Sequence, residues 1–227
     1  MHRLNVTIEL KNGNERDIEI AVSDLVIFVW TGRNTDIIKK EVEELSRIGI
    51  SGPKNIPEIY VLQPYLVTTS NYIRRVSDLH SGEVEYVLLV KNEDEIYVTV
   101  GSDHTDREAE RCSVLAGKHM YPPKIVARRA WPLRDIKDHW DELVLRSWIL
   151  EDDKKTLYQE GTTKFLLTPP EKLVDLIREV VPDLKNVVVF SGTIPTIKGQ
   201  IKPSGYFEIE LHDPVLNRSI NHYYWIE

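Results

Sequence analysis

Three acidic residues in the middle of the chain have a spacing that suits a metal site. Glu83 and Glu85 lie two apart in a β-rich run over 83–90, so their side chains project from the same face of a strand. Asp103 follows the next β-rich run, 96–100, and a hairpin of the two runs places it beside the glutamates. Carboxylates at ~4 Å repel one another by about 4 kcal/mol per pair at an effective dielectric constant of about 20, so a shared site needs protons or a cation. Oxygen ligands alone favour Mg²⁺, Mn²⁺ or Ca²⁺.

A second interpretation gives the same acids no chemistry. Glu83 and Glu85 then line the solvent face of an alternating strand, and Asp103 helps to cap the helix that follows it. The polar run 102–108 has two interpretations as well: a solvated helix start with caps and ion pairs, or an acid, a base and a cation around one centre. The candidates for the latter are His104, Arg107 and Glu108.

The surrounding pattern predicts many strands and few helices. Alternating apolar residues around Asn12-Gly13 indicate a hairpin over 4–22. Further strands are expected at 25–30, 83–90, 96–100, 143–150, 156–159, 187–190, 206–211 and 219–226. Helical spacing predicts helices at 34–49, 105–117, 133–142 and 170–180, with Thr105 and Glu108 forming a capping box. The pattern favours an α+β, strand-rich fold with a few peripheral helices rather than regular βαβ repeats.

Composition narrows the class of protein. The chain has 227 residues, of which 41% are hydrophobic and 29% charged, and a net charge of −7. An acidic chain without a basic run predicts neither nucleic acid nor membrane as a partner, and the alternating sequence that follows Met1 predicts no signal peptide. We therefore expect a cytoplasmic protein, and its few glutamines and abundant Ile, Lys and Glu are thermophile-like. The single cysteine, Cys112, excludes an internal disulfide, and its place on the apolar helix face predicts a buried thiol.

Read in order, the motifs resemble those of the fumarylacetoacetate hydrolase superfamily, in its C-terminal catalytic domain. Glu83-Val84-Glu85 is similar to the family's Glu-x-Glu strand, and 103–108 is similar to its Asp-x-(Ser/Thr)-Ala-Arg-Asp segment. The segment 115–122 resembles a family lysine segment, 158–163 resembles Gln-x-Gly-x-Thr, and 191–195 resembles Thr-Gly-Thr-Pro. The most similar branch is a little-characterised one with Gly-Ser-Asp-His-Thr-Asp-Arg-Glu, here 101–108, together with the motifs at 30–33 and 139–141.

The resemblance implies a fold and a set of site residues. The fold is a mixed β-sandwich or roll of the fumarylacetoacetate hydrolase type, with a small α+β lead-in region over 1–80 and the catalytic domain over 81–227. The implied metal ligands are Glu83, Glu85 and Asp103, and the metal is Mg²⁺, with Mn²⁺ or Ca²⁺ as alternatives. Lys118 is the implied catalytic lysine, and substrate contacts are implied for Gln159, Ser191, Gly192 and Thr193.

The implied activity is that of a metal-dependent enzyme acting on a small anionic keto-acid or diketo-acid through a stabilised enolate. Hydrolysis of a carbon–carbon bond, of the acylpyruvase type, is the first expectation, and oxaloacetate-type decarboxylation or keto–enol isomerisation is the alternative. Hydrolysis needs a general base, for which His104, His119 and His139 are candidates. A protein of another class, a non-catalytic metabolite binder that kept the fold, also fits. Family members are commonly dimers, so the resemblance implies a homodimer.

Overall fold

The computed structural model describes residues 2–34, 38–39, 42, 51–53, 55–119, 123–166 and 170–227. The chain begins with the expected hairpin, β1 (His2–Glu9) and β2 (Glu15–Val22). Its turn contains Gly13 at φ +83°, a conformation that glycine adopts without strain. The helix expected over 34–49 falls largely outside the described residues.

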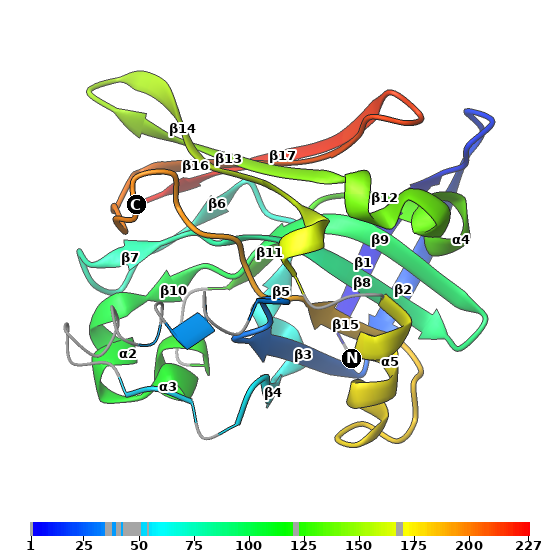
Figure 1. Ribbon diagram of the computed structural model, residues 1–227, viewed down its shortest axis with the longest axis horizontal. Helices are drawn as coiled ribbons and strands as arrows, with labels where there is room; N and C mark the ends of the chain where they lie inside the picture. Colours follow the sequence, from blue (N-terminus) through cyan, green and yellow to red (C-terminus); the bar gives the residue numbers. More distant parts are fainter. Residues whose placement is uncertain are drawn as a thin grey trace.

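A large mixed sheet forms one layer of the molecule (Figure 1). Its main path runs β2-β1-β12-β9-β8-β15-β3-β4, with β11 and β5 attached beside β9. The bounds of its remaining strands are β3 (Asp24–Val29), β4 (Glu58–Leu62), β5 (Val67–Thr68), β8 (Val84–Asn92), β9 (Glu95–Ser102), β11 (Lys124–Val126), β12 (Arg129–Pro132) and β15 (Val187–Phe190). The pairs β1–β12, β3–β15 and β5–β11 are parallel, and the other pairs are antiparallel.

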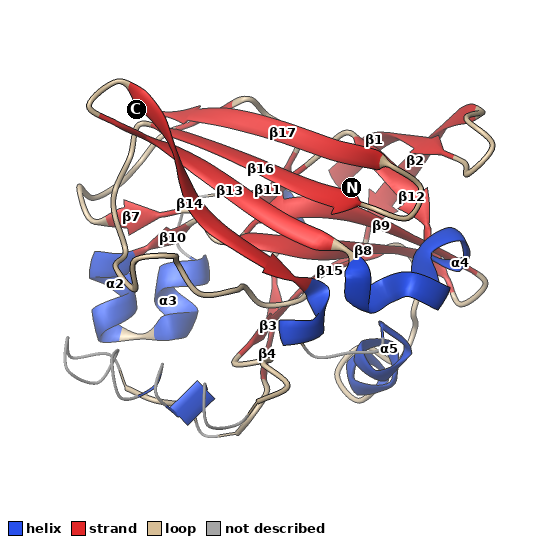
Figure 2. Cartoon of the chain, turned by 45° about the horizontal axis from the view of Figure 1, so that its top comes forward, coloured by secondary structure: helices blue, strands red, loops and turns tan. Residues whose placement is uncertain are grey.

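A second sheet covers one face of the first (Figure 2). Its order is β14-β13-β16-β17-β6, with bounds β6 (Tyr72–Ile73), β13 (Val144–Glu151), β14 (Lys154–Thr162), β16 (Tyr206–Asp213) and β17 (Arg218–Ile226). The main core lies between the two sheets and includes Tyr86, Leu88 and Phe207. On the other face of the large sheet, a second apolar cluster contains Val87, Leu89 and residues of the N-terminal hairpin. Strand β8 is therefore buried on both faces, which gives its N-terminal end a rigid base.

Short helices lie at the periphery. They are η1 (Pro64–Leu66), α2 (Arg107–Cys112), α3 (Val114–His119), α4 (Leu133–Ile136), η2 (Lys137–Glu142), η3 (Thr163–Phe165) and α5 (Pro170–Arg178). A two-residue ladder, β7 (His80–Ser81) with β10 (Thr105–Asp106), precedes α2. The strand-rich α+β class expected from the pattern is confirmed. No helix in the described part of the chain is both long and apolar enough to span a bilayer.

Two local predictions around α2 are wrong. The helix cap is Asp106, whose carboxylate accepts from the backbone N–H of Glu108 and Ala109, whereas Thr105 belongs to β10. The thiol of Cys112 is exposed, because the helix expected over 105–117 breaks at Ser113 and its halves turn different faces inward.

The proposed boundary at residue 80 stays a prediction. Strands β1 to β4 come from the region before it, and β8, β9, β12 and β15 come from the region after it. Both groups lie in the same sheet, so any lead-in region shares its hydrogen-bonded framework with the catalytic region.

Candidate metal centre

The open end of the β8–β9 hairpin carries the three acids. Val84 pairs with Ser102, and the backbone N–H of Asp103 donates to the carbonyl of Glu83 at 3.0 Å. Ligand oxygens of Glu83, Glu85 and Asp103 lie within 4.8 Å of one another, as the hairpin argument requires. The structure thus brings the three carboxylates together, and their role as metal ligands stays a prediction.

Two of these carboxylates are neutralised by buried cations. Glu83 receives Arg107 Nη2 at 2.7 Å on one oxygen and Lys118 Nζ at 3.2 Å on the other. Asp103 is paired with Lys118 through Oδ2 and with Lys124 Nζ through Oδ1, the latter at 2.5 Å. Burial alone would raise the pKa of Asp103, but Lys118 and Lys124 outweigh it and lower the pKa to about 2. The pKa of Glu83 is lowered as well, because Arg107 and Lys118 outweigh its burial.

Glu85 differs from its two neighbours. Its side chain is 1% exposed and accepts the backbone N–H of Gly192 at 2.8 Å, and no described cation lies within ion-pair distance of it. Burial, with Asp103 and Glu83 nearby, raises the pKa of Glu85 well above its ordinary value. A buried carboxyl beside two carboxylates, without a counter-charge of its own, is chemistry that suits a divalent cation, so the donor set fits such an ion.

The charges around the acids favour an anionic ligand once a cation is bound. Four carboxyl groups, those of Glu83, Glu85, Asp103 and Glu110, face three buried cations. These cations are Arg107, Lys118 and Lys124. With all four carboxyl groups ionised, a divalent cation would change the balance from one excess negative charge to one excess positive charge, and that excess attracts a carboxylate or an enolate.

Arg107 forms its ion pair on the helix with Glu110 and not with Glu108. Its guanidinium donates to Glu110 at 2.7 Å, to Glu83 at 2.7 Å and to Ser81 Oγ at 2.9 Å. Residues three apart on a helix share a face, so Glu110 points inward with Arg107 while Glu108 is exposed to solvent. Glu108, for which a catalytic role was expected, is therefore not part of this ion-pair network in the described part of the chain. Glu110 is, and the sequence analysis did not predict it.

Lys124 is the other missed residue. The sequence analysis did not assign it to the site, and its side chain is 0% exposed. It lies on β11, which pairs with both β5 and β9, and its ammonium also donates to the carbonyl of His104 at 2.7 Å. Lys124 is buried because β11 pairs with segments that lie far away in the sequence, and no local sequence pattern predicts that pairing.

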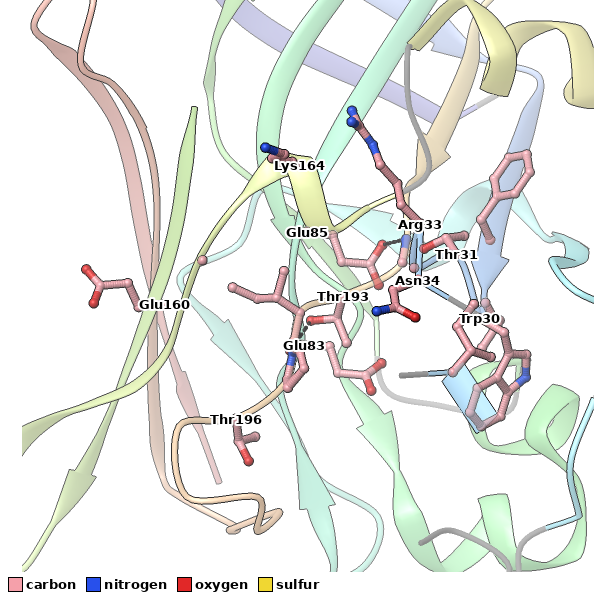
Figure 3. Close-up of a pocket in the computed structure, with 18 of the residues that line it drawn as sticks. Trp30, Thr31, Arg33, Asn34, Glu83, Glu85, Glu160, Lys164, Thr193 and Thr196 are labelled. Carbon is pink, nitrogen blue, oxygen red and sulfur yellow. Dashed lines mark hydrogen bonds between the residues drawn. The ribbon is translucent and has the colours of Figure 1, made fainter. Parts of the chain in front are cut away.

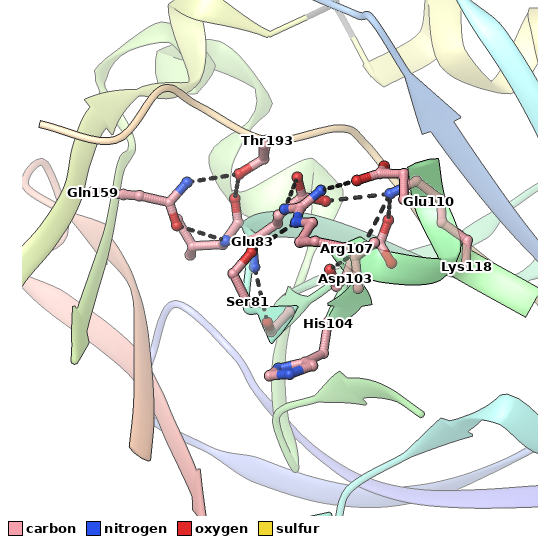
Figure 4. A network of polar contacts seen from close by, with 12 residues as sticks. Ser81, Glu83, Asp103, His104, Arg107, Glu110, Lys118, Gln159 and Thr193 are labelled. Atoms are coloured by element: carbon pink, nitrogen blue, oxygen red, sulfur yellow. Dashed lines mark hydrogen bonds and ion pairs between the residues drawn. The ribbon is translucent and has the colours of Figure 1, made fainter. Parts of the chain in front are cut away.

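The candidate histidines do not face the acids. His104 is buried between His80, at 3.0 Å, and the hydroxyl of Tyr224, at 2.8 Å, and its ring points away from the carboxylates (Figure 4). Burial and the neighbouring His80 lower the pKa of His104 well below its usual value. His139 lies 3.0 Å from Asp213. Within the described part of the chain, neither these two rings nor His119 lines the main cavity.

A cavity of about 860 Å³ opens in front of Glu83 and Glu85 (Figure 3). We call the side formed by Glu83, Glu85, Arg107, Glu110 and Lys118 the carboxylate wall. The opposite side, residues 30–34, is called the strap. The remaining lining residues are Phe28, Val29, Ile38, Glu160, Gly161, Lys164, Gly192, Thr193, Ile194, Pro195, Thr196 and Ile197.

Among the described residues, Arg33 and Thr31 tie the strap to other segments of the chain. Arg33 pairs with both oxygens of Asp141, at 3.0 and 2.5 Å, and donates from Nε to the carbonyl of Leu166 at 3.1 Å. At the other end, a Cβ on Gly192 would lie only 2.2 Å from the hydroxyl of Thr31, and Gly192 has φ +88°. Glycine is therefore required where the strap meets the loop that carries Gly192. The two tryptophan motifs seen in the sequence, at 30–33 and 139–141, thus contact each other.

The residues expected to bind substrate divide into two pairs. Gly192 and Thr193 line the cavity, whereas Ser191 and Gln159 are buried and are not among its lining residues. The N–H of Gly192 is donated to Glu85, and the hydroxyl of Thr193 donates to the carbonyl of Val84 at 2.8 Å. These polar groups therefore have partners within the protein.

Solved structures identify the class of fold. A fumarylacetoacetate hydrolase family protein from Yersinia pestis CO92 superposes with a TM-score of 0.66 at 16% identity, over 97% of this chain and 100% of that one. A fumarylpyruvate hydrolase from Pseudomonas aeruginosa, in complex with Mn²⁺ and pyruvate, gives 0.62 at 13% identity, over 98% and 95%. A 2-keto-3-deoxyarabinonate dehydratase gives 0.64 at 13% identity, over 91% and 74%. The protein has the fumarylacetoacetate hydrolase fold, as the resemblance implied.

A protein-family model gives the particular family. The model described as "Protein of unknown function (DUF2848)" matches residues 29–224, and the chain belongs to that family. No curated protein matches the sequence. Assignment to a branch defined by the motif at 101–108 stays a prediction.

Proposed function

We propose that this protein is a divalent-metal-dependent enzyme that acts on a small keto-acid or diketo-acid through a stabilised enolate. The observation that carries the proposal is the buried Glu85, which has no described cationic partner, lines the cavity beside Glu83, and has a ligand oxygen within 4.8 Å of one from Asp103. Solved proteins of the same fold include one in complex with Mn²⁺ and pyruvate and one named as a keto-sugar-acid dehydratase, which supports the choice of substrate class.

In this proposal Glu83, Glu85 and Asp103 hold the cation, with Mg²⁺ as the first candidate and Mn²⁺ or Ca²⁺ as alternatives. When bound, such a cation supplies a Lewis acid that stabilises negative charge on a keto oxygen. The chain's own part is to position that charge. Lys118, held by Glu83 and Asp103, adds a cation beside the forming enolate, and Arg107 fixes the carboxylate of Glu83. Apolar lining residues, among them Phe28, Val29 and Ile194, give the uncharged part of a substrate a surface to pack against.

Hydrolysis of a carbon–carbon bond of the acylpyruvase type is our first candidate reaction. It requires a group that activates water, and the described histidines do not line the cavity. That observation favours a second candidate, decarboxylation or keto–enol isomerisation, since neither uses activated water; isomerisation still needs a group that takes up and returns a proton. A non-catalytic metabolite-binding protein is the alternative of another class.

Calorimetry with Mn²⁺, with and without oxalate as an enolate mimic, tests the proposal. We expect the wild-type protein to bind Mn²⁺ and then oxalate, and we expect Glu85→Gln to bind neither. A screen of acylpyruvates and oxaloacetate then separates hydrolysis from decarboxylation by the products released. Metal-dependent oxalate binding without turnover of any keto-acid would favour the non-catalytic alternative. Absence of Mn²⁺ binding by the wild-type protein would overturn the metal-enzyme proposal.

We also propose that the enzyme is a cytoplasmic homodimer. Light scattering coupled to size-exclusion chromatography tests the assembly, for which a mass of one 26.3 kDa chain would contradict the dimer and twice that mass would support it. Localisation of a fluorescent fusion in the native host tests the compartment.

A further inference from the structure

Strand β8 pairs with β15 over only part of its length, and the pairing ends before the end of β8 that lies at Glu83 and Glu85. Strand β15 pairs with β8 only as far as Phe190, which lies opposite Val87. On the other edge, β9 continues the ladder to Ser102, opposite Val84. The backbone N–H and C=O of Val84, between the two glutamates, therefore need partners from outside the sheet.

Side chains supply those partners. Gln159 Oε1 accepts the N–H of Val84 at 3.1 Å, and Thr193 Oγ1 donates to the carbonyl of Val84 at 2.8 Å. Gln159 Nε2 in turn donates to Thr193 Oγ1 at 3.0 Å (Figure 4). It also donates to the carbonyl of Ile194 at 2.6 Å. Together these two side chains continue the hydrogen bonding of the missing strand along one residue of β8.

The Gln159 amide is fully used by these bonds. Its oxygen also accepts the hydroxyl of Ser147 at 2.9 Å, so the oxygen has two donors and the nitrogen has two acceptors. The side chain is 1% exposed and is not among the cavity-lining residues. A substrate contact would need one of four buried hydrogen bonds to break, and each buried group left without a partner costs about 1–3 kcal/mol.

We infer that Gln159 is a positioning residue, which holds the Glu83–Glu85 segment and the 191–194 loop at a fixed separation and so sets the geometry of the metal ligands. The inference replaces the substrate contact that the resemblance implied for Gln159, and it rests on the proposed metal site. It also gives the second sheet a role in the chemistry, because Gln159 belongs to β14 and Ser147 to β13. Outer-shell partners of metal ligands affect affinity in this way because they fix ligand orientation.

The test compares Gln159→Met, which keeps length and burial but removes every hydrogen bond of the amide, with Gln200→Met, the same change at an exposed glutamine. Mn²⁺ affinity is measured by electron paramagnetic resonance, and exchange of the Val84 amide is measured by NMR. We expect Gln159→Met to weaken Mn²⁺ binding roughly 10-fold or more. We also expect Val84 to exchange faster while amides of β8 opposite β15 keep their protection.

Ser147→Ala covers the case in which Gln159→Met fails to fold. It removes one donor to Gln159 Oε1 and leaves the amide in place, so the shifts should have the same direction and be smaller. Unchanged Mn²⁺ affinity together with an unchanged Val84 amide in these variants would overturn the inference, as would a rise in KM alone. If the wild-type protein binds no Mn²⁺, the proposed function fails, and the Val84 amide still decides whether Gln159 holds the strand.

Discussion

The two walls of the cavity are built in opposite ways. The carboxylate wall consists of residues on or beside regular elements that are buried or, for Glu83, partly buried, and most of its charges have partners at 2.7–3.2 Å. The strap follows β3 as irregular chain, has a non-glycine residue, Trp30, at φ +63°, and carries the half-exposed ion pair Arg33–Asp141. Under the proposed function, the paired carboxylate wall would fix the reacting centre, and the strap would select substrate shape, because changes in the strap would have little effect on that centre.

The largest effect is expected at Asp103, whose carboxylate is fully buried and paired with two lysines. Asp103→Ala leaves the buried Lys124 without its carboxylate partner and Lys118 with Glu83 alone, and an uncompensated buried charge costs about 3–5 kcal/mol. We expect a large fall in the free energy of unfolding and loss of Mn²⁺ binding, measured by denaturant titration and calorimetry. Asp183→Ala, at an exposed aspartate, is the matched control and should change neither. A variant as stable as wild type would show that the carboxylate wall is not held by these ion pairs.

Glu85 sharpens the comparison within the carboxylate wall. Burial, with Asp103 and Glu83 nearby, raises the pKa of Glu85 well above the ordinary value, which favours the uncharged carboxyl, and glutamine has nearly the same shape. Glu85→Gln should therefore keep the free energy of unfolding within ~1 kcal/mol of wild type in metal-free buffer, on the scale of one neutral hydrogen bond. The same variant should lose Mn²⁺ binding in calorimetry. Retained Mn²⁺ binding would remove Glu85 from the ligand set.

Gly192 tests the point at which the two walls meet. Gly192→Ala places a Cβ 2.2 Å from the Thr31 hydroxyl at φ +88°, and such backbone strain costs about 1–3 kcal/mol. We expect a matching fall in the free energy of unfolding, measured by denaturant titration. Adding Thr31→Ala should recover part of this loss, since it removes the nearest clashing atom. If the two changes are simply additive, the strap does not rest on the Gly192 loop.

How much could be predicted from sequence differs between the walls for a physical reason. The proximity of Glu83, Glu85 and Asp103 follows from strand periodicity and one hairpin, which are local properties. To predict that Glu110 points inward, one had to know that the helix cap is Asp106, one residue after the expected cap. A shift of one residue rotates a helix by about 100°, enough to exchange an exposed acid for a buried one.

The rest depends on contacts between distant segments. Lys124 is buried because β11 pairs with β5 and β9, and Gln159 reaches Val84 from the other sheet. The strap was visible only as a motif at 30–33, because its place opposite the carboxylates is set by the order of strands in the large sheet. Local patterns carry no information on such pairings, so they appear only in the folded chain.

A smaller effect is expected on the strap. Arg33→Ala removes a partly exposed ion pair, which contributes about 0.2–1 kcal/mol. We expect a minor change in the free energy of unfolding, unchanged affinity for Mn²⁺ and for oxalate, and an altered KM for keto-acids with a longer tail. Asp141→Asn, which removes the same pair from the other side, is the matched variant. A loss of Mn²⁺ affinity in either variant would show that the walls are coupled through this pair.

The smallest expected effect is on the pH dependence of the free energy of unfolding, and it too should differ between the carboxylate wall and the strap. His80 stacks on His104 behind the carboxylate wall, and burial, followed by Arg75, lowers its pKa below 6.5 despite the nearby Asp78 and Asp106. As the pH falls through about 6.5, the unfolded chain takes up a proton that the folded chain does not, so the wild-type protein loses stability on acidification. His80→Gln removes that proton uptake and should flatten the decline by less than ~1.4 kcal/mol per pH unit, measured by denaturant titration between pH 5 and 7 at about 25 °C. Arg33→Ala should leave the slope unchanged, because the described strap contains no histidine. An equal change of slope in both variants would show that the region behind the carboxylate wall and the strap do not differ in their response to pH.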